Sequence, residues 1–440
     1  MSSTKKQRRL LKRSLPGVLK TNTDPTVVGL WCASLILVGF GVVMVLSASS
    51  VTSYLQDKGF LGTASRQASY ALFGLVVMVV AAYIKPEVYR RFAPLLLVGA
   101  LLFQLLVFTP LGEEVWGNRN WIRIAGLSLQ PSEFLKLAMV LWVAFVISSR
   151  RHRMTNVKNE VFPMLIPGAA IILLSVILGQ DLGTTIVMGF ALLGCMWFGN
   201  ISLKTIMLTV GTALVGVFVL VVTSENRMRR LFSLGSDSGD YSGLDWQPTH
   251  GLWALASGGL FGVGPGNSSA KWSWLPAAEN DYIFAIIGEE LGMIGASAVI
   301  TAYVALAFLM LRVLNRAKDR FSRVVVGGVL IWIVGQAFIN IGVVLRILPV
   351  LGVPLPLISY GGTALVACMG AMGVVISIAR NNTAAAAKAD SEAGGSGKQA
   401  AGRSAAGERD AGRAAGGERK AGRSGARSAA DPVMIYTPGH

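Results

Sequence analysis

The sequence predicts an all-α polytopic membrane protein, and three observations support this fold class. The 440 residues are 53% hydrophobic and only 14% charged, whereas ordinary soluble domains carry about a quarter charged residues. Several apolar runs reach the roughly 20 residues that an α-helix needs to cross a bilayer. These runs lack the alternating segments of about ten residues that an outer-membrane β-barrel would show.

Polar segments flank the apolar part of the chain at both ends. Residues 1–25 form a basic arm, and the run at about 27–48 is too long for a signal peptide, so it predicts a retained first span. Residues 381–440 are rich in Ala, Gly, Ser, Lys and Arg and have almost no large apolar side chains. This segment cannot bury a core, and we predict a disordered cytoplasmic tail.

The segment 26–380 is predicted to be the membrane domain, with ten transmembrane helices. The predicted spans are about 27–48, 68–84, 93–109, 133–148, 162–179, 183–199, 203–223, 282–311, 324–347 and 361–379. Lys and Arg favour cytoplasmic loops. With the N-terminus inside, every even-numbered connection carries such cations, and so does the C-terminal tail. Both termini are therefore predicted to be cytoplasmic, and no clear internal repeat supports an inverted-repeat transporter.

Cysteines and net charge exclude several other classes. Cys32, Cys195 and Cys368 are widely spaced inside apolar runs, a pattern that indicates neither a disulfide framework nor a zinc site. We predict no protein metal site. Much of the net charge of +17 lies in loops and tails beside apolar runs. This placement indicates topology and contact with anionic lipid rather than nucleic-acid binding.

Two long loops on the predicted outer side, about 110–132 and 224–281, contain cations and many tryptophans. The cations are Arg119, Arg123, Arg227, Arg229, Arg230 and Lys271. Long outer loops tolerate some Arg, but together these cations suggest an anion, and phosphate or diphosphate suits Arg best. The tryptophans belong either to an interfacial belt or to sites that contact sugar rings or a lipid chain.

A glycine-rich segment, "GGLFGVGPGNSS" at 258–269, lies in the second of these loops. It does not follow a predicted strand and does not lead into Lys-Ser or Lys-Thr, so a phosphate-binding P-loop is disfavoured. Glycine permits tight backbone turns. We therefore predict a tightly folded re-entrant or surface segment.

Several carboxylates lie at the predicted ends of spans. Glu133 lies in the first turn of the fourth span, where the helix dipole stabilises it, and Lys136 follows one turn deeper. Asp281 directly precedes the eighth span. It is either a helix cap or a general base beside cations and a phosphorylated lipid. Glu289 lies roughly 12 Å deeper and about 80° around the helix, and Glu290 about 180° around it. All three therefore cannot serve one site, and we expect the two glutamates to contact neighbouring helices or a polar cavity.

Five motifs in chain order resemble the SEDS family, the shape, elongation, division and sporulation proteins. They are "QPSEFLKLA", "GQDLGTT", "SGGLFGVGPGNS", "ENDYIFAIIGEELGMIG" and "PLISYGGTAL". The resemblance covers about 27–380. The "IGEELG" segment and "VLSASS" at 45–50 are more similar to the division members than to the elongation members.

The resemblance implies a peptidoglycan glycosyltransferase. Such an enzyme polymerises lipid II into β-1,4 glycan strands at the outer face of the cytoplasmic membrane of a bacterium, here at the division septum. Asp281 matches the essential acidic position, with the implied role of deprotonating the acceptor 4-hydroxyl. Implied substrate-binding residues are Trp121, Arg119, Lys271, Arg227, Arg230 and Ser359, and implied structural or activation residues are Glu289, Glu290 and Glu133. The chain departs from the family pattern at Asn120, where Arg is usual directly before the Trp.

The resemblance also implies partners. They are the lipid II substrate, a class B penicillin-binding protein that cross-links the new strands, and other division membrane proteins. No cofactor is certain, and a divalent cation at the diphosphate is a candidate. The alternative functions are a lipid II flippase and a non-catalytic division scaffold.

Overall fold

The computed structural model describes residues 24–55, 59, 61–115, 118–124, 126–149, 170–223, 228, 246–272, 275 and 278–384. The basic arm, nearly all of the C-terminal tail and much of the predicted loop 224–281 lie outside these residues. Within the described part, eight helices are long and apolar enough to cross a bilayer. The prediction of a polytopic helical membrane protein is confirmed at this level.

The described helices follow the predicted spans closely. They are α2 (Pro25–Leu55), α3 (Gly62–Tyr83), α4 (Pro86–Leu105), η1 (Leu106–Phe108), α5 (Pro131–Ser149), α7 (Ala170–Leu178), α8 (Leu182–Phe198), α9 (Leu203–Val222), α11 (Trp246–Ser257), α12 (Ile283–Arg316), α13 (Arg320–Leu330), η3 (Ile331–Gly335) and α14 (Gln336–Val344), followed by a last helix, Gly362–Ala384. The fifth predicted span is described only from Ala170 onward, and α8 is shorter than the other spans.

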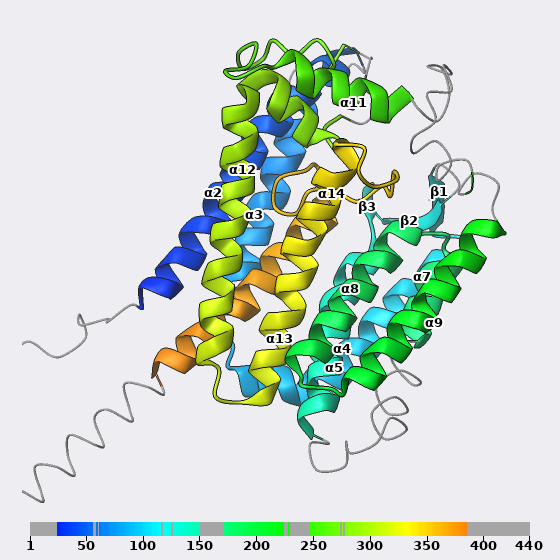
Figure 1. Ribbon diagram of the computed structural model, residues 1–440, viewed down its shortest axis with the longest axis vertical. Helices are drawn as coiled ribbons and strands as arrows, with labels where there is room; N and C mark the ends of the chain where they lie inside the picture. The colour runs from blue at the N-terminus through cyan, green and yellow to red at the C-terminus, as the bar shows by residue number, and fades with distance from the viewer. Residues whose placement is uncertain are drawn as a thin grey trace, which may run out of the picture. The chain divides into compact units, whose positions relative to one another are not determined.

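The last helix lies at the centre of the bundle. In the most apolar 18-residue stretch of this helix, 94% of the residues are buried. The corresponding share for α9 is 11%, so α9 lies at the edge of the bundle. Small residues allow this burial, because they let helix backbones approach closely in a membrane. At Gly373, for example, a Cβ atom would lie only 2.5 Å from the carbonyl oxygen of Met78 in α3. Around this centre, α2 packs on both α3 and α12, and α13 packs on α5 and α8 (Figure 1).

A small antiparallel β-sheet is the one departure from the predicted all-α class. Its strands are β1 (Gly112–Val115), β2 (Asn118–Ile124) and β3 (Leu127–Leu129), in the order β1-β2-β3. Ile122 pairs with Gly112 on one side and with Leu129 on the other, and its side chain is fully buried. The apolar side chain of Ile122 anchors the sheet because alternate residues of β2 face the helices. The sequence analysis treated this segment only as a loop.

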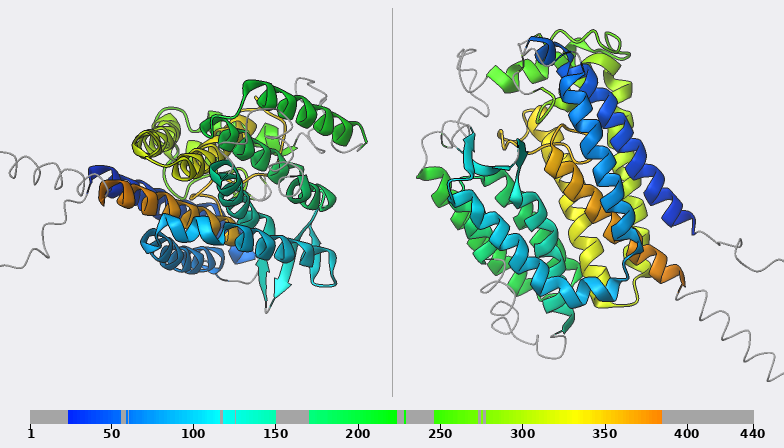
Figure 2. Two further views of the ribbon diagram at one scale, coloured as in Figure 1. Left: turned by 90° about the horizontal axis from the view of Figure 1, so that it is seen from below. Right: turned by 180° about the vertical axis from the view of Figure 1, so that it is seen from behind.

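The bundle has two ends, the sheet end and the tail end. The sheet end carries the β-sheet, α11 and the start of α12, and the tail end carries the start of α2 and the ends of α12 and the last helix (Figures 1 and 2). At the tail end, Arg316 Nη1 lies 2.6 Å from Asp24 Oδ2, and Thr383 Oγ1 donates to the same oxygen at 3.1 Å. One carboxylate thus connects three helices.

The Asp24 cluster predicts a pH dependence of stability. Burial raises the pKa of Asp24, but hydrogen bonds from Thr26 and Thr383 and the charge of Arg316 outweigh it, so the pKa lies below the ordinary value of 3.8. A depressed folded pKa gives stability that is present above the unfolded pKa and is lost as pH falls through the folded pKa. We expect Asp24→Asn to lower the thermal unfolding midpoint in detergent slightly at neutral pH. The difference from wild type should be constant above pH 3.8, shrink as pH falls below it, and disappear once the folded Asp24 is protonated; a difference that does not shrink in acid would contradict the charge mechanism.

Candidate functional site

Asp281 lies at the sheet end, directly before α12. The helix begins at Ile283 with Tyr282 at the N-cap position, and no side-chain capping hydrogen bond forms at this N-cap residue. The residue at the N-cap position is therefore Tyr282 rather than Asp281, the predicted cap. The Asp281 side chain is half-buried. This position leaves its carboxylate at the boundary between the bundle and the exterior.

The segment 351–353 lies beside Asp281. A Cβ atom on Gly352 would lie 3.6 Å from Asp281 Oδ2. Asn340 of α14 connects the two segments, because its Nδ2 donates to the carbonyl oxygens of Asp281 at 2.7 Å and Val353 at 2.8 Å. Asn340 is buried. Its amide therefore fixes the backbone of Asp281 against this segment.

A second carboxylate, Asp181, lies on the other side of the same segment. Its Oδ2 accepts from Asn120 at 2.8 Å and Gln130 at 3.1 Å, and its Oδ1 accepts from the backbone N–H of Thr184, which caps α8. At Gly183, the second residue of α8, a Cβ atom would lie 2.1 Å from the carbonyl oxygen of Leu351. The start of α8, segment 351–353 and Asp281 therefore form one continuous packed region. Asp181 lies in the motif "GQDLGTT" but was not among the predicted site residues, although a lone carboxylate in a short turn between two apolar runs was a signal for it.

The predicted binding residues of β2 lie in this region. The backbone N–H of Arg119 donates to the carbonyl of Gly179 at 3.0 Å, and Arg119 Nη2 donates to the carbonyl of Thr109 at 3.0 Å. Trp121 is half-buried and pairs with Glu113 across the β1–β2 ladder. The unusual Asn120 is the residue that binds Asp181. The departure from the family pattern therefore has a structural role here.

Ser359 lies in a buried turn before the last helix. Its Oγ accepts from the backbone N–H of Leu355 at 2.8 Å, and its carbonyl accepts from Gln67 Nε2 of α3 at 3.1 Å. The next residue, Tyr360, donates its backbone N–H to the carbonyl of Glu279 at 2.8 Å, two residues before Asp281. The hydroxyl of Ser359 is thus engaged within its own turn, and the turn connects α3 to the segment that carries Asp281.

Tyr360 also reveals a cation that the sequence analysis did not single out. Burial, Tyr70 and Glu279 raise the pKa of Tyr360, while Arg66, which hydrogen-bonds the phenol, opposes them. The raised pKa keeps this group a neutral phenol at physiological pH. Arg66 is exposed in the first turns of α3. It lies two residues before the predicted span 68–84, in the first outer connection, whereas the predicted cations came from the two longer outer loops.

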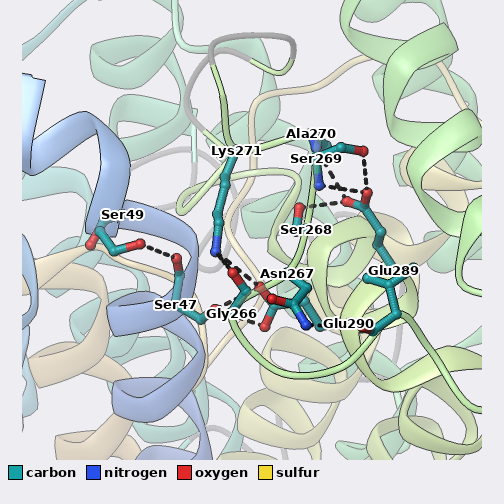
Figure 3. A network of polar contacts seen from close by, with 12 residues as sticks. Ser47, Ser49, Gly266, Asn267, Ser268, Ser269, Ala270, Lys271, Glu289 and Glu290 are labelled. Carbon is teal, nitrogen blue, oxygen red and sulfur yellow. Dashed lines mark hydrogen bonds and ion pairs between the residues drawn. The ribbon is translucent and has the colours of Figure 1, made fainter.

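Glu289 is surrounded by neutral donors from the glycine-rich loop (Figure 3). Its Oε1 accepts from the N–H of Ser269 at 2.9 Å and from Ser269 Oγ at 2.7 Å, and its Oε2 accepts from the hydroxyl of Ser268 and, at 3.4 Å, the N–H of Ala270. A buried carboxylate is tolerated when several donors satisfy it. These contacts fix residues 268–270 on α12.

Glu290 faces the opposite direction and contacts α2. Ser47 Oγ donates to both carboxylate oxygens, at 2.6 Å and 2.7 Å, and Lys271 Nζ lies 3.7 Å from Glu290 Oε1. Lys271 is buried, and its ammonium also donates to the carbonyl of Gly266 (Figure 3). Glu290 is nine residues beyond Asp281, about 14 Å along a helix axis. The described contacts of Lys271 are therefore with Gly266 and Glu290 rather than with Asp281.

Glu133 and Lys136 form an ion pair inside the bundle. Lys136 Nζ lies 2.8 Å from Glu133 Oε1, and both side chains are 2% exposed. The ammonium also donates to Gln336 Oε1 at 3.3 Å and lies 5.3 Å from the ring centroid of Trp332. Trp332 lies in the π-helical turn η3, a distortion often found at functional sites. The wider turn brings Trp332 and Gln336 to the same cation.

Two predicted residues and one predicted cofactor have no described geometry. Arg227 and Arg230 lie outside the described residues. In the part of the chain that the structure describes, no group of three His, Cys, Asp or Glu side chains could hold a metal ion. A cation at the diphosphate stays a prediction.

Comparison with known proteins identifies the family. A model of the FtsW, RodA and SpoVE family of cell cycle proteins matches residues 28–384. The chain belongs to this family. The match covers every described helix from α2 onward apart from the first residues of α2. The SEDS resemblance of the five motifs is confirmed.

Relatives and solved structures of the FtsW, RodA and SpoVE family agree with this result. A Mycobacterium tuberculosis protein described as a probable peptidoglycan glycosyltransferase FtsW is 36% identical, over 80% of this chain and 67% of its own length. A chain from a structure of a peptidoglycan synthase complex, which reports coordination of polymerization and crosslinking, has a TM-score of 0.66 at 21% identity and covers 80% of this chain and 97% of its own. Thermus thermophilus RodA has a TM-score of 0.60 at 23% identity, over 80% and 96% of the two chains. The two solved structures show the shared fold.

Proposed function

We propose that the protein is a peptidoglycan glycosyltransferase that polymerises lipid II into β-1,4 glycan strands during septal wall synthesis in cell division. The place of Asp281 carries the proposal, because its half-buried carboxylate lies at the sheet end with its backbone fixed by Asn340. The relative described as FtsW supports both the activity and the division branch.

In the proposed reaction, the Asp281 carboxylate accepts the proton of the 4-hydroxyl of the acceptor N-acetylglucosamine. That oxygen attacks C1 of the donor N-acetylmuramic acid as the bond from C1 to the diphosphate breaks. Undecaprenyl diphosphate leaves with the bonding electrons, and the configuration at C1 inverts. Asn340 contributes by holding Asp281 and Val353 in one arrangement, which avoids reorganisation during the reaction.

The leaving diphosphate requires positive charge close to it. Among the described candidates, Arg119 uses one guanidinium nitrogen for the carbonyl of Thr109, and a guanidinium has five N–H donors in total. We therefore assign the diphosphate to Arg119 rather than to Lys271, whose ammonium donates within its own loop. A divalent cation would supply the same kind of charge.

The membrane arrangement follows from the same proposal. The ten predicted spans would place the sheet end outside the cytoplasmic membrane, with the loop 224–281 between the seventh and eighth spans and both termini inside. The location would be the division septum. A class B penicillin-binding protein is the proposed partner, which the similarity to a chain of a peptidoglycan synthase complex supports.

Reconstitution tests this function against its alternatives. The full chain, with a class B penicillin-binding protein in liposomes, should convert fluorescent lipid II into glycan polymers that a muramidase digests. The buried pair Glu133–Lys136 is the observation that favours a flippase, since ionisable residues inside a membrane often mark transport pathways. Transbilayer movement of lipid II without any polymer would favour that alternative, and neither activity would favour a scaffold.

A further inference from the structure

The glycine-rich turn at 258–264 replaces hydrogen bonds that α12 lacks at an internal break. Gly292 has φ 66° and ψ −167°, so it interrupts the helix. An unbroken helix would join the N–H of Met293 to the carbonyl of Glu289, and that of Ile294 to the carbonyl of Glu290. Instead, these two N–H groups donate to the carbonyls of Gly259 at 2.9 Å and Leu260 at 3.3 Å.

The two carbonyls released by the break also find partners in the same turn. The carbonyl of Glu289 accepts from the N–H of Val263 at 2.9 Å, and that of Glu290 accepts from Gly264 at 3.1 Å. The fit requires glycine, because a Cβ atom on Gly262 would lie 2.1 Å from the carbonyl oxygen of Glu290. All four backbone groups of the broken turn are thus satisfied, which is the condition for irregular backbone at membrane depth.

The depth of the break follows from the length of α12. Going from the break toward the tail end, Arg312 is the first cation of α12, and Gly292 lies 20 residues before it, or about 30 Å along the axis. This length equals the roughly 30 Å hydrocarbon thickness of a bilayer. In α2, Ser47 lies 22 residues after Pro25, about 33 Å, and it binds Glu290 next to the break. The lengths of α12 and α2 therefore agree that the break at Gly292 lies where the hydrocarbon core meets the headgroups, in the leaflet at the sheet end.

The side chains of the turn form an exposed apolar patch at this level. Phe261 is 79% exposed, Leu260 56%, and Val263, Met293 and Ile294 contribute the rest. The patch continues the exposed apolar stripe of α12, which includes Val304 and Phe308 and faces lipid in a membrane-spanning helix. Isolated exposed apolar residues need no explanation, but a contiguous patch indicates an interaction surface.

We propose that the patch Leu260, Phe261, Val263, Met293 and Ile294 is an interfacial anchor that inserts into the acyl-chain boundary of the leaflet at the sheet end. The anchor sets the height of the loop 258–271 relative to the bilayer. Glu289 and Glu290 lie one turn or less toward the sheet end from the break, so they are at the interface rather than deep in hydrocarbon. The inference rests on the membrane-spanning helices and is independent of the glycosyltransferase activity.

Depth-dependent quenching tests the anchor in the full chain. Cys32 is exposed and Cys195 and Cys368 are buried, so a Cys32→Ser background allows single labelling of Phe261→Cys with an environment-sensitive fluorophore. In phosphatidylethanolamine–phosphatidylglycerol liposomes, we expect lipids brominated on the acyl chains to remove most of the fluorescence, and aqueous iodide to remove little. Asn267→Cys, exposed in the same loop, is the matched control and should show the reverse pattern.

Each other outcome overturns the anchor. Iodide quenching at 261 equal to that at 267 would place the turn in water. Protection of 261 from both quenchers would show that protein covers the patch, as a partner transmembrane helix would. Leu260→Cys serves as a second site on the same turn if the Phe261 variant does not fold, and it should give the same lipid quenching as Phe261→Cys.

Discussion

Asp281→Asn is expected to lower the rate of glycan polymerisation at least about a hundredfold, because general-base catalysis contributes typically 10²–10⁴-fold. The amide cannot accept the proton of the acceptor hydroxyl, whereas its size is almost unchanged. The contacts around it should persist, since Asn340 binds the carbonyl of residue 281 rather than its side chain. The measurement is single-turnover coupling of labelled lipid II by the purified full chain with its penicillin-binding partner.

A matched control separates loss of the catalytic base from the mere loss of one negative charge at the site. Glu279 lies two residues before Asp281, and the contact it provides to Tyr360 uses its backbone carbonyl. Glu279→Gln removes a nearby acidic charge without touching the proposed base, so polymerisation should stay within a few-fold of wild type. Substrate binding should survive in both variants, which a lipid II co-sedimentation assay can verify. Near-normal polymer from Asp281→Asn would remove Asp281 as the base, even if the protein proved to be a glycosyltransferase.

The spans were predictable because each depends on a local property, the length of an apolar run. The predicted runs at about 27–48 and 203–223 correspond to α2 and α9. Glu290 contacts α2, in line with the expected contact to a neighbouring helix, whereas Glu289 contacts the glycine-rich loop, a partner that the helical rotation did not indicate. The five motifs indicated the family because they are specific residue sequences in a fixed order, whereas hydropathy alone indicates only the spans.

The features that were missed all depend on contacts between distant residues. The break in α12 at Gly292 is stabilised by a turn about 30 residues earlier, and the run 282–311 by itself resembles one uninterrupted span. The β-sheet consists of short strands whose stability depends on Ile122 packing against the bundle. Asp181 accepts hydrogen bonds from Asn120 and Gln130, which are more than 50 residues away in the sequence. Neither local propensity nor periodicity reports such partners.

The predicted site residues divide by what they contact. Asp281, Arg119 and Trp121 lie in the region formed by segment 351–353, the start of α8 and β2. Glu289 binds residues 268–270, and Glu290 binds Lys271, about 12–14 Å further along α12. If the patch around Phe261 fixes that loop at the bilayer boundary, these three residues set the position of the chain leading to Asp281.

Lys136→Met is expected to destabilise the protein by about 3–5 kcal/mol, the typical cost of breaking a buried ion pair by removing one partner. The substitution leaves the Glu133 carboxylate without its cation in a site where both side chains are 2% exposed. Glu133 Oε2 already has no hydrogen-bond partner among the described residues. Met fills a similar volume, so the loss of charge compensation should dominate over the loss of packing. Chemical unfolding in detergent, followed by tryptophan fluorescence, measures the change.

The double variant Glu133→Gln, Lys136→Met distinguishes a structural pair from a functional one. Removing both charges should restore most of the stability, because replacing a complete buried pair is often neutral. Glu133→Gln alone leaves a buried ammonium with Gln336 and the Trp332 ring, so it should destabilise the protein less than Lys136→Met.

A double variant that is stable and still polymerises lipid II would limit the role of the pair to packing of the bundle. A double variant that is stable but inactive would show that the charges act in the reaction, as the resemblance of "QPSEFLKLA" to the family motif implies. No recovery of stability would contradict the charge-compensation mechanism itself.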